Sequence, residues 1–247
     1  MIRKLVDYIP DSEPAGPMMV LEAFTDTLWD VRRMRALSMR EIKWIMKGVL
    51  LGVWTVHMRG LVYTDLKMEN IVLGGFDPDQ PNENVKDVIV RLADCGGIRK
   101  PSTEKITALT YRSPEVHFNK PWDQSTDVWS WGIILAQLLQ AQVGFHAPGI
   151  YDTLNPLPQL VPKTAVEKEH ALRDQLAIDF DLSSVPFYAD CREELPPPQP
   201  EQAYMWANTM VEKGVAAEDV QFLVEVLHPD PRARITVREI LEGGYLG

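Results

Sequence analysis

The sequence predicts an α+β fold that is mainly α-helical, with few strands. Capping boxes, in which a Ser or Thr is followed three residues later by Glu, predict helix starts at Ser38 and Thr236. Apolar residues recur at helical spacing over long stretches of the chain after residue 25. Strand-type runs are short and lie within the first hundred residues. These observations place most of the core on helices.

Two short apolar runs at the beginning of the chain, residues 2–9 and 18–24, predict a β-hairpin. The link between them, residues 11–17, is rich in turn-forming residues. Two strands alone are marginally stable in water, so the hairpin needs a further surface to pack against. Residues 25–35 then predict a short helix. Its apolar positions are Leu28, Trp29 and Val31.

A long core helix is predicted from the capping box at Ser38 to about residue 58. Its apolar stripe consists of Ile42, Ile45, Met46, Val49, Val53 and Val56. Gly60 ends this helix. His57, near the helix end, is interpreted as a packing residue or a favourable C-terminal charge rather than as a ligand.

Residues 71–73 and 87–92 predict two paired strands. The residues between them, 74–87, are rich in Gly, Pro, Asn and Asp and predict a surface insertion. The second strand leads into Asp94, which is followed by Cys95 and two glycines. Glycine allows backbone angles that other residues avoid, and this suits an acid that is aimed into a site.

The second half of the chain predicts four helices. One starts at Ser125 and is so hydrophobic that it must be buried on most sides. Its apolar face is formed by Val128, Trp131, Ile134, Leu135, Leu138 and Leu139. Residues 144–162 read as a loop and residues 164–178 as a helix. An amphipathic helix over residues 217–227 and a last helix behind Thr236 complete the prediction.

Residues 195–200, Leu-Pro-Pro-Pro-Gln-Pro, exclude both a helix and a central strand, because proline lacks the backbone N–H. Two interpretations remain open. The segment is either a stiff surface connector or a docking segment for a domain that reads proline-rich sequences.

Composition limits the classes of function. With 45% apolar and 24% charged residues, the chain of 247 residues is typical of a soluble globular protein. A net charge of −10 argues against nucleic acid or an anionic membrane as the main partner. No run approaches the roughly 18 uninterrupted apolar residues of a membrane span. Two cysteines, Cys95 and Cys191, without metal-type spacing fit a reducing compartment. We therefore expect an intracellular protein, cytoplasmic or nuclear.

Three polar residues follow the first long helix and precede a strand. Asp65, Lys67 and Asn70 can point from one constrained loop into a common space. A carboxylate that takes a proton, an ammonium that faces phosphate and an amide oxygen that faces Mg²⁺ are the groups that phosphoryl transfer requires. Taken alone, the same residues also fit a polar surface loop between a helix and a strand.

Five motifs in order resemble the hinge and C-terminal lobe of eukaryotic protein kinases, over nearly the whole chain. The motifs are Tyr63-Thr64-Asp65 with Lys67 and Asn70, Asp94-Cys95-Gly96, Ser113-Pro114-Glu115, Asp127-Val-Trp-Ser-Trp-Gly132, and Asp230-Pro-Arg-Ala-Arg234. Lys67 points to the Ser/Thr type. Thr64, together with Tyr111-Arg112, resembles SR-protein kinases and neighbouring branches.

The resemblance implies roles for individual residues at the catalytic loop. Asp65 orients the substrate hydroxyl and accepts its proton, while Lys67 neutralises charge on the phosphoryl group. Asn70 and Asp94 hold Mg²⁺ between the phosphates of ATP. The implied cofactors are thus ATP and Mg²⁺, and the implied partner is a protein that carries Ser or Thr.

The resemblance also implies a hinge and a supporting framework. By position, Leu21 is the gatekeeper, and backbone groups of Glu22 and Phe24 meet the adenine. Asp127 braces the catalytic loop through its backbone amides. A structural ion pair joins Glu115 and Arg234.

Departures from the family pattern are expected to weaken catalysis. The Gly-rich loop, the ATP-binding lysine and its glutamate partner belong before residue 1, so residues 1–25 are read as a remnant hairpin and hinge and residues 26–247 as the C-terminal lobe. Lys4 lies too close to the hinge to replace the lysine. Thr64 replaces the family's arginine, and Ala108 replaces a threonine that usually contacts the catalytic acid.

Three interpretations of the function remain open. The chain is an ATP- and Mg²⁺-dependent Ser/Thr protein kinase with Asp65 as base. Alternatively, it is a pseudokinase-like interaction module, or a truncated product whose N-terminal lobe is missing.

Overall fold

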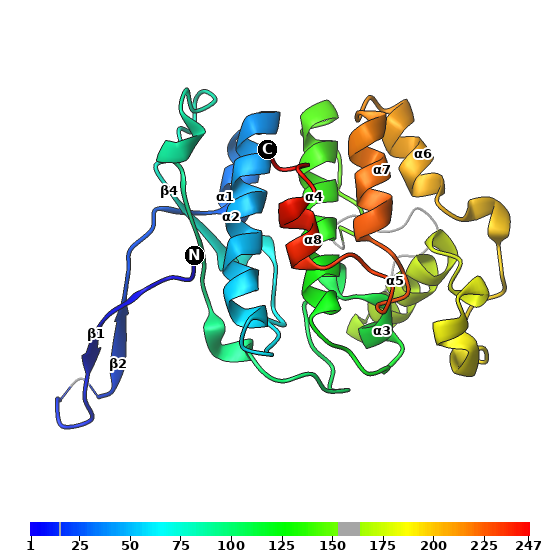
Figure 1. Cartoon of the computed structure of the whole chain (residues 1–247), viewed down its shortest axis with the longest axis horizontal. Helices are drawn as coiled ribbons and strands as arrows, with labels where there is room; N and C mark the ends of the chain where they lie inside the picture. The colour runs from blue at the N-terminus through cyan, green and yellow to red at the C-terminus, as the bar shows by residue number, and fades with distance from the viewer. Residues whose placement is uncertain (15, 153–163) are drawn as a thin grey trace.

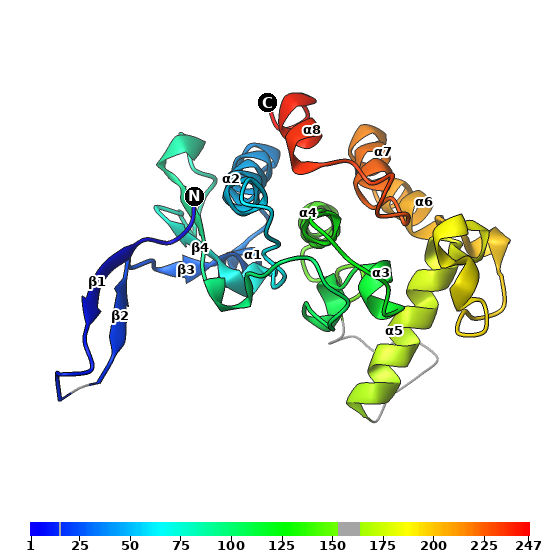
Figure 2. The same cartoon turned by 60° about the horizontal axis from the view of Figure 1, so that its bottom comes forward.

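Two long helices, α2 (Met39–His57) and α4 (Ser125–Val143), lie side by side at the centre of the structure (Figures 1 and 2). The computed structural model describes residues 1–14, 16–152 and 164–247. Nearly all residues of α4 are buried, including Trp129 and Trp131, as its hydrophobicity predicts. Gly132 allows the close approach of α7, because a Cβ atom there would lie 2.7 Å from Cδ2 of Leu227.

The remaining helices are shorter than this pair. They are α1 (Leu28–Met34), α3 (Pro114–His117), α5 (Ala165–Asp179), α6 (Met205–Glu212), α7 (Ala217–Val226) and α8 (Val237–Glu242). Capping boxes at Thr27, Ser38, Thr164 and Thr236 start α1, α2, α5 and α8. The fold is therefore α+β and mainly α, with a helical body as predicted.

The strands form two small antiparallel sheets. The first is the predicted hairpin of β1 (Leu5–Ile9) and β2 (Met18–Leu21). The second has the order β3 (Asp26–Thr27), β4 (Ile71–Gly74) and β5 (Ile89–Leu92). Ile71 pairs with Leu92 and Gly74 with Ile89, so the residues before β4 and after β5 lie beside one another.

The sequence patterns did not predict strand β3 or helices α3 and α6. Strand β3 is only two residues long and depends on its pairing with β4. Helix α3 is a single turn that begins at Pro114. Helix α6 follows Tyr204, whose positive φ of 57° cannot be read from the sequence. The predicted loop over 144–162 is irregular up to residue 152, and its remainder lies outside the described residues.

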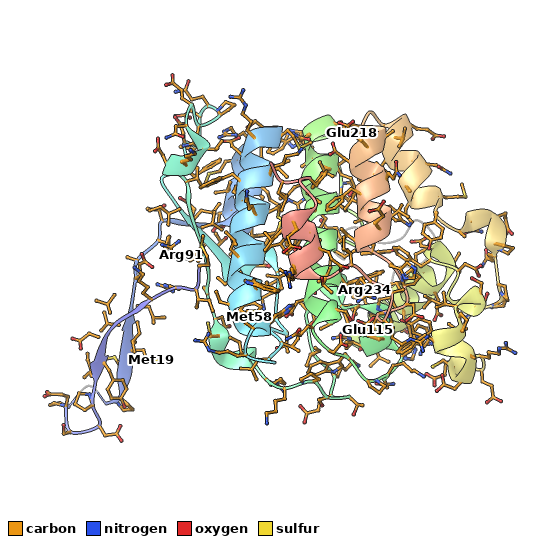
Figure 3. The ribbon with its side chains drawn as sticks, in the orientation of Figure 1. Met19, Met58, Arg91, Glu115, Glu218 and Arg234 are labelled. Carbon is orange, nitrogen blue, oxygen red and sulfur yellow. The ribbon has the colours of Figure 1, made fainter. Side chains whose placement is uncertain are left out.

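The β1–β2 hairpin projects from the helical body at the side where the chain begins (Figures 1 and 2). Its apolar side chains are largely exposed, including Met19, which Figure 3 labels, at 67% and Val20 at 40%. The separation of residues 1–25 from residues 26–247 as a distinct remnant stays a prediction.

Arg35 and Glu41 hold the insertion between β4 and β5, and the Asn82 amide of the insertion donates to Glu41 at 3.0 Å. The Arg35 guanidinium donates to the backbone oxygens of Asp77 and Gln80 and forms an ion pair with the buried Glu41 at 2.6 Å. These bonds fix the insertion against the beginning of α2. Across the described ranges, no helix combines the length and apolarity needed to cross a membrane.

Candidate active site

The segment between α2 and β4, residues 58–70, is called the catalytic-type loop below. Gly60 has a φ of +67°, and its N–H donates to the His57 carbonyl. Thr64 also has a positive φ, +71°, although it is β-branched. Such a conformation is an outlier for threonine and costs on the order of 1–3 kcal/mol. It survives because surrounding contacts hold it.

Asp127 supplies the first of these contacts. Its side chain is 1% exposed, and its carboxylate accepts hydrogen bonds from the Tyr63 and Thr64 amides at 2.8 and 2.9 Å. Nε2 of His57 lies 2.8 Å from the same carboxylate. His57 is thus a buried partner of Asp127, a role that its position in the sequence did not reveal.

Asp65 lies at the tip of this braced loop with 29% of its side chain exposed. Lys67 Nζ donates to Asp65 Oδ2 at 2.7 Å, and Asn70 Nδ2 donates to the same oxygen at 2.9 Å. Asn70 also donates to the Asp65 backbone oxygen. Both side-chain bonds use Oδ2, so Oδ1 accepts no hydrogen bond from the described residues.

Strand pairing brings Asp94 to the same loop. The Ala93 N–H, directly after β5, donates to the Asn70 carbonyl at 2.8 Å, and the Tyr63 hydroxyl donates to the Ala93 carbonyl. Asp94 follows with a left-handed φ of +50° and an exposed side chain. Burial raises the pKa of Tyr63, as do the nearby charges of Cys95, Asp65, Asp94 and Asp127, so its hydroxyl stays a neutral donor.

The donor set suits Mg²⁺ with ATP phosphates rather than a cation held by protein alone. In the part of the chain that the structure describes, no group of three His, Cys, Asp or Glu side chains could hold a metal. Asn70 directs its N–H groups to Asp65, which leaves Oδ1 without a protein partner among these residues. One amide oxygen and one exposed carboxylate, Asp94, fit a cation that takes its other ligands from phosphates and water.

Two hydroxyl groups connect the catalytic-type loop to the segment after β5. Thr64 Oγ1 donates to the Gly97 carbonyl at 2.8 Å, and Thr107 Oγ1 donates to the Thr64 carbonyl at 2.6 Å. Thr107 also has a positive φ, +67°. Ala108 cannot make a side-chain hydrogen bond, so the preceding residue supplies a different contact to this loop. Nothing in the sequence signalled this role of Thr107.

The expected hinge residues lie at the base of the hairpin. Leu21 ends β2 and pairs with Leu5. The backbone groups of Glu22 are already used within the chain: its N–H donates to Lys4 O at 2.9 Å, and its oxygen accepts from Arg3 Nε at 2.6 Å. A nucleotide that used the Glu22 oxygen would therefore compete with Arg3.

Phe24 differs from Glu22 in its backbone contacts. Its backbone N–H and oxygen make no hydrogen bond within the described residues. The Phe24 ring lies against Gly74, where a Cβ atom would lie 3.5 Å from Cδ1 of the ring. The ring thus connects the predicted hinge to the end of β4.

Glu115 and Arg234 form the ion pair that the resemblance implies. The residues come from α3 and from the segment before α8, and Figure 3 shows them side by side. The two hydrogen bonds are 2.8 and 3.0 Å long, and neither side chain is exposed. The fold and this arrangement of polar side chains define a kinase-like protein.

Comparison with known proteins gives the family. A model of the protein kinase domain matches residues 2–246, and the chain belongs to this family. Mitogen-activated protein kinase p38b of Drosophila melanogaster is 23% identical, with coverage of 98% of this chain and 62% of that protein. Serine/threonine-protein kinase nekl-2 of Caenorhabditis elegans is 27% identical, with coverage of 54% and 34%. The chain spans less than two thirds of the length of these relatives.

A solved structure supports the fold. The crystal structure of the yeast RNA Pol II CTD kinase CTDK-1 complex matches with a TM-score of 0.70 at 17% identity. The match covers 98% of this chain and 74% of that chain. At this level of identity, the likeness establishes a kinase-like fold and nothing narrower.

Proposed function

We propose that the chain is the catalytic lobe of a Ser/Thr protein kinase that transfers a phosphoryl group from ATP to a protein hydroxyl. The observation that carries the proposal is the state of the Asp65 carboxylate. Lys67 and Asn70 hold Oδ2, while Oδ1 has no partner within the described chain. A general base needs this combination of a fixed orientation and one free oxygen.

The roles of the surrounding side chains follow from their positions. Asp65 Oδ1 accepts the proton of the substrate hydroxyl. Lys67 Nζ, 2.7 Å from Asp65, places a positive charge beside the group that is transferred. Asp127 keeps the loop in position through the Tyr63 and Thr64 amides. Catalysis of this kind depends mainly on such positioning and on charge stabilisation.

Asn70 Oδ1 and the Asp94 carboxylate would hold Mg²⁺. When bound, this ion neutralises charge on the ATP phosphates. Leu21, Glu22 and Phe24 would face the adenine, with Phe24 offering free backbone groups and Glu22 an oxygen shared with Arg3. The protein substrate carries Ser or Thr. The narrower likeness to SR-protein kinases stays a prediction.

A second function, a non-catalytic interaction module, is favoured by one observation at the hinge. Both backbone groups of Glu22 are already hydrogen-bonded within the chain, and this weakens the expected adenine contact. In this alternative the helical lobe is kept as a binding surface, with structural roles for Glu115, Asp127 and Arg234.

Two measurements separate these functions. We expect Mg²⁺-ATP to raise the melting temperature, and Asp94→Asn to abolish this shift. We also expect transfer of labelled γ-phosphate to Ser or Thr of a basic acceptor protein, and Asp65→Asn to reduce it at least about a hundredfold. The exposed variant Glu218→Gln on α7 serves as the matched control. A shift without transfer supports the interaction module, whereas the absence of both contradicts nucleotide binding altogether.

A further inference from the structure

Residues 195–200, called the proline strip below, present a short extended segment on the surface. Each proline ring fixes φ near −65°, and a residue that precedes proline is driven away from the helical region. Residues 196–199 belong to no helix or strand. Gln199, with φ −132° and ψ 67°, ends the extended run before a 3₁₀ turn over Pro200–Gln202. The strip therefore offers about one turn of polyproline II helix, Pro196 to Pro198.

The protein holds both ends of this strip. The Leu195 N–H donates to the Cys191 carbonyl at 3.2 Å, and the Leu195 side chain packs against the core. At the other end, the Gln202 N–H donates to the Gln199 carbonyl at 2.9 Å. On its inner side, the strip borders a hollow lined by Ala177, Ile178, Asp181 and Ser183. A partner would thus bind a segment whose conformational entropy is already reduced.

The outer side of the strip is free. Pro197, Pro198 and Pro200 are exposed, and Pro196 is half-buried. The carbonyls of residues 196–198 accept no hydrogen bond from the described residues. This part of the chain, yellow to gold in Figures 1 and 2, lies at the end of the molecule opposite the β1–β2 hairpin. Binding here would leave the catalytic-type loop and the hairpin uncovered.

The strip is flanked by carboxylates. Glu193, Glu194 and Glu201 are exposed, and the cations beside them are Arg192 in the sequence and Arg173 in space. Glu194 approaches Arg173 only to 3.9 Å, and Glu193 and Glu201 form no ion pair within the described residues. A complementary surface would place basic residues on both sides of the groove that receives the prolines.

We propose that the proline strip is a docking site for a protein domain with an aromatic-lined groove and a basic rim. Aromatic rings pack against the proline rings, and their N–H or O–H groups donate to the free carbonyls of residues 196–198. The exposed carboxylates meet the basic rim. The groove is short, because the run of prolines is only one turn long. This docking site is independent of phosphoryl transfer.

The test uses recombinant WW, SH3 and EVH1 domains as dye-labelled probes against the whole chain. At least one of them binds with a dissociation constant in the micromolar range. Replacing Pro197 and Pro198 together by Ala weakens binding at least tenfold and leaves the melting temperature unchanged. The matched control replaces Pro78 and Pro81, two exposed prolines of the insertion, by Ala and leaves binding unchanged.

The carboxylates are tested separately. Glu193→Gln together with Glu201→Gln weakens binding several-fold at low salt and reduces its dependence on ionic strength. The proposal is overturned when none of the three probes binds, or when the Pro197/Pro198 variant binds as tightly as the unmodified chain. Concentration-dependent self-association that this variant loses would assign the strip to a second copy of the chain, and would likewise overturn the proposal.

Discussion

Arg234 and Glu115 are joined by two hydrogen bonds between side chains that are completely shielded from solvent. The guanidinium also donates to the backbone oxygens of His228 and Ser125, at 2.8 and 2.9 Å. The pair therefore connects α3, the beginning of α4 and the segment before α8. Among the described residues, both oxygens of the Glu115 carboxylate accept their hydrogen bonds from this one arginine.

Removing one partner of this pair leaves the other charge buried without compensation. We expect Glu115→Gln to lower the free energy of unfolding by about 3–5 kcal/mol. Urea denaturation measures the change. The control, Glu242→Gln, breaks the exposed pair with Arg238 and changes stability by less than about 0.5 kcal/mol. A loss below about 1 kcal/mol for Glu115→Gln would show that the pair is not a stabilising connection.

The sequence predicted those parts of the fold that local patterns determine. The capping boxes at Ser38 and Thr236 and the apolar run after Ser125 depend only on neighbouring residues, so their helices could be placed. The left-handed backbones of Thr64 and Thr107 could not be predicted. Both are unfavourable locally. Asp127 and the Gly97 carbonyl hold Thr64 from distant parts of the chain, and Thr107 is held by its own hydrogen bond to the Thr64 carbonyl.

In the candidate site, too, some features follow from local sequence patterns and others depend on distant contacts. Asp65, Lys67, Asn70 and Asp94 follow from ordered motifs, and strand pairing accounts for their proximity. The contact of Arg3 with Glu22 depends on how the first residues lie beside β2, and no pattern in the sequence specifies that arrangement.

Asp127→Asn tests the support of the catalytic-type loop. The asparagine keeps one acceptor but turns an N–H group toward the Tyr63 and Thr64 amides or toward His57. We expect a loss of stability of about 2–3 kcal/mol, because buried donors lose their acceptor. Hydrogen exchange should accelerate at the Tyr63 and Thr64 amides. Asp190→Asn, at an exposed position, serves as the control, and unchanged exchange in Asp127→Asn would contradict the bracing role.

Arg3→Ala tests whether the hydrogen bond from Arg3 to the Glu22 oxygen hinders the nucleotide at the predicted hinge. This prediction rests on the proposal of ATP binding. Removing the guanidinium frees the Glu22 oxygen, so Mg²⁺-ATP should bind several-fold more tightly by calorimetry. Lys4→Ala keeps the Arg3 contact and should bind as the unmodified chain does. Weaker binding by Arg3→Ala would instead indicate that Arg3 assists the nucleotide.

Glu41 should make stability depend on pH in the acidic range. Burial acts to raise its pKa, but hydrogen bonds from Arg35, the Asn82 amide and Ser38 overcome this and lower it to about 2. The unfolded chain therefore binds a proton more readily between about pH 4.5 and 2, and stability falls as the pH decreases through this window. At pH values above this window, the lowered pKa of Glu41 contributes about 3 kcal/mol to the free energy of unfolding. Glu41→Gln should flatten this part of the curve, and an equally steep curve would contradict the assignment.

His117 should also make stability fall with decreasing pH. Unlike Glu41, which is buried in its charged form, His117 is buried in its neutral form. Both ring nitrogens are buried and have no hydrogen-bond partner among the described residues. Burial, with the positive charges of Arg112, Lys105 and Arg173, lowers its pKa to about 3. The unfolded histidine is protonated below about pH 6.5. Stability therefore decreases as the pH falls from about 6.5 towards 3, because only the unfolded chain gains the proton.

Replacing the His117 imidazole by an apolar side chain should remove both the cost of the unpaired ring nitrogens and the loss of stability at low pH. We expect His117→Leu to raise the free energy of unfolding by about 1–2 kcal/mol at pH 7, because no buried polar atom is left unpaired. Its stability should also decline less between pH 6.5 and 4 than that of the unmodified chain. Urea denaturation at several pH values measures both effects, with the exposed His146→Leu as the control. A destabilised His117→Leu at pH 7 would show that the imidazole makes a favourable contact that outweighs its missing hydrogen bonds.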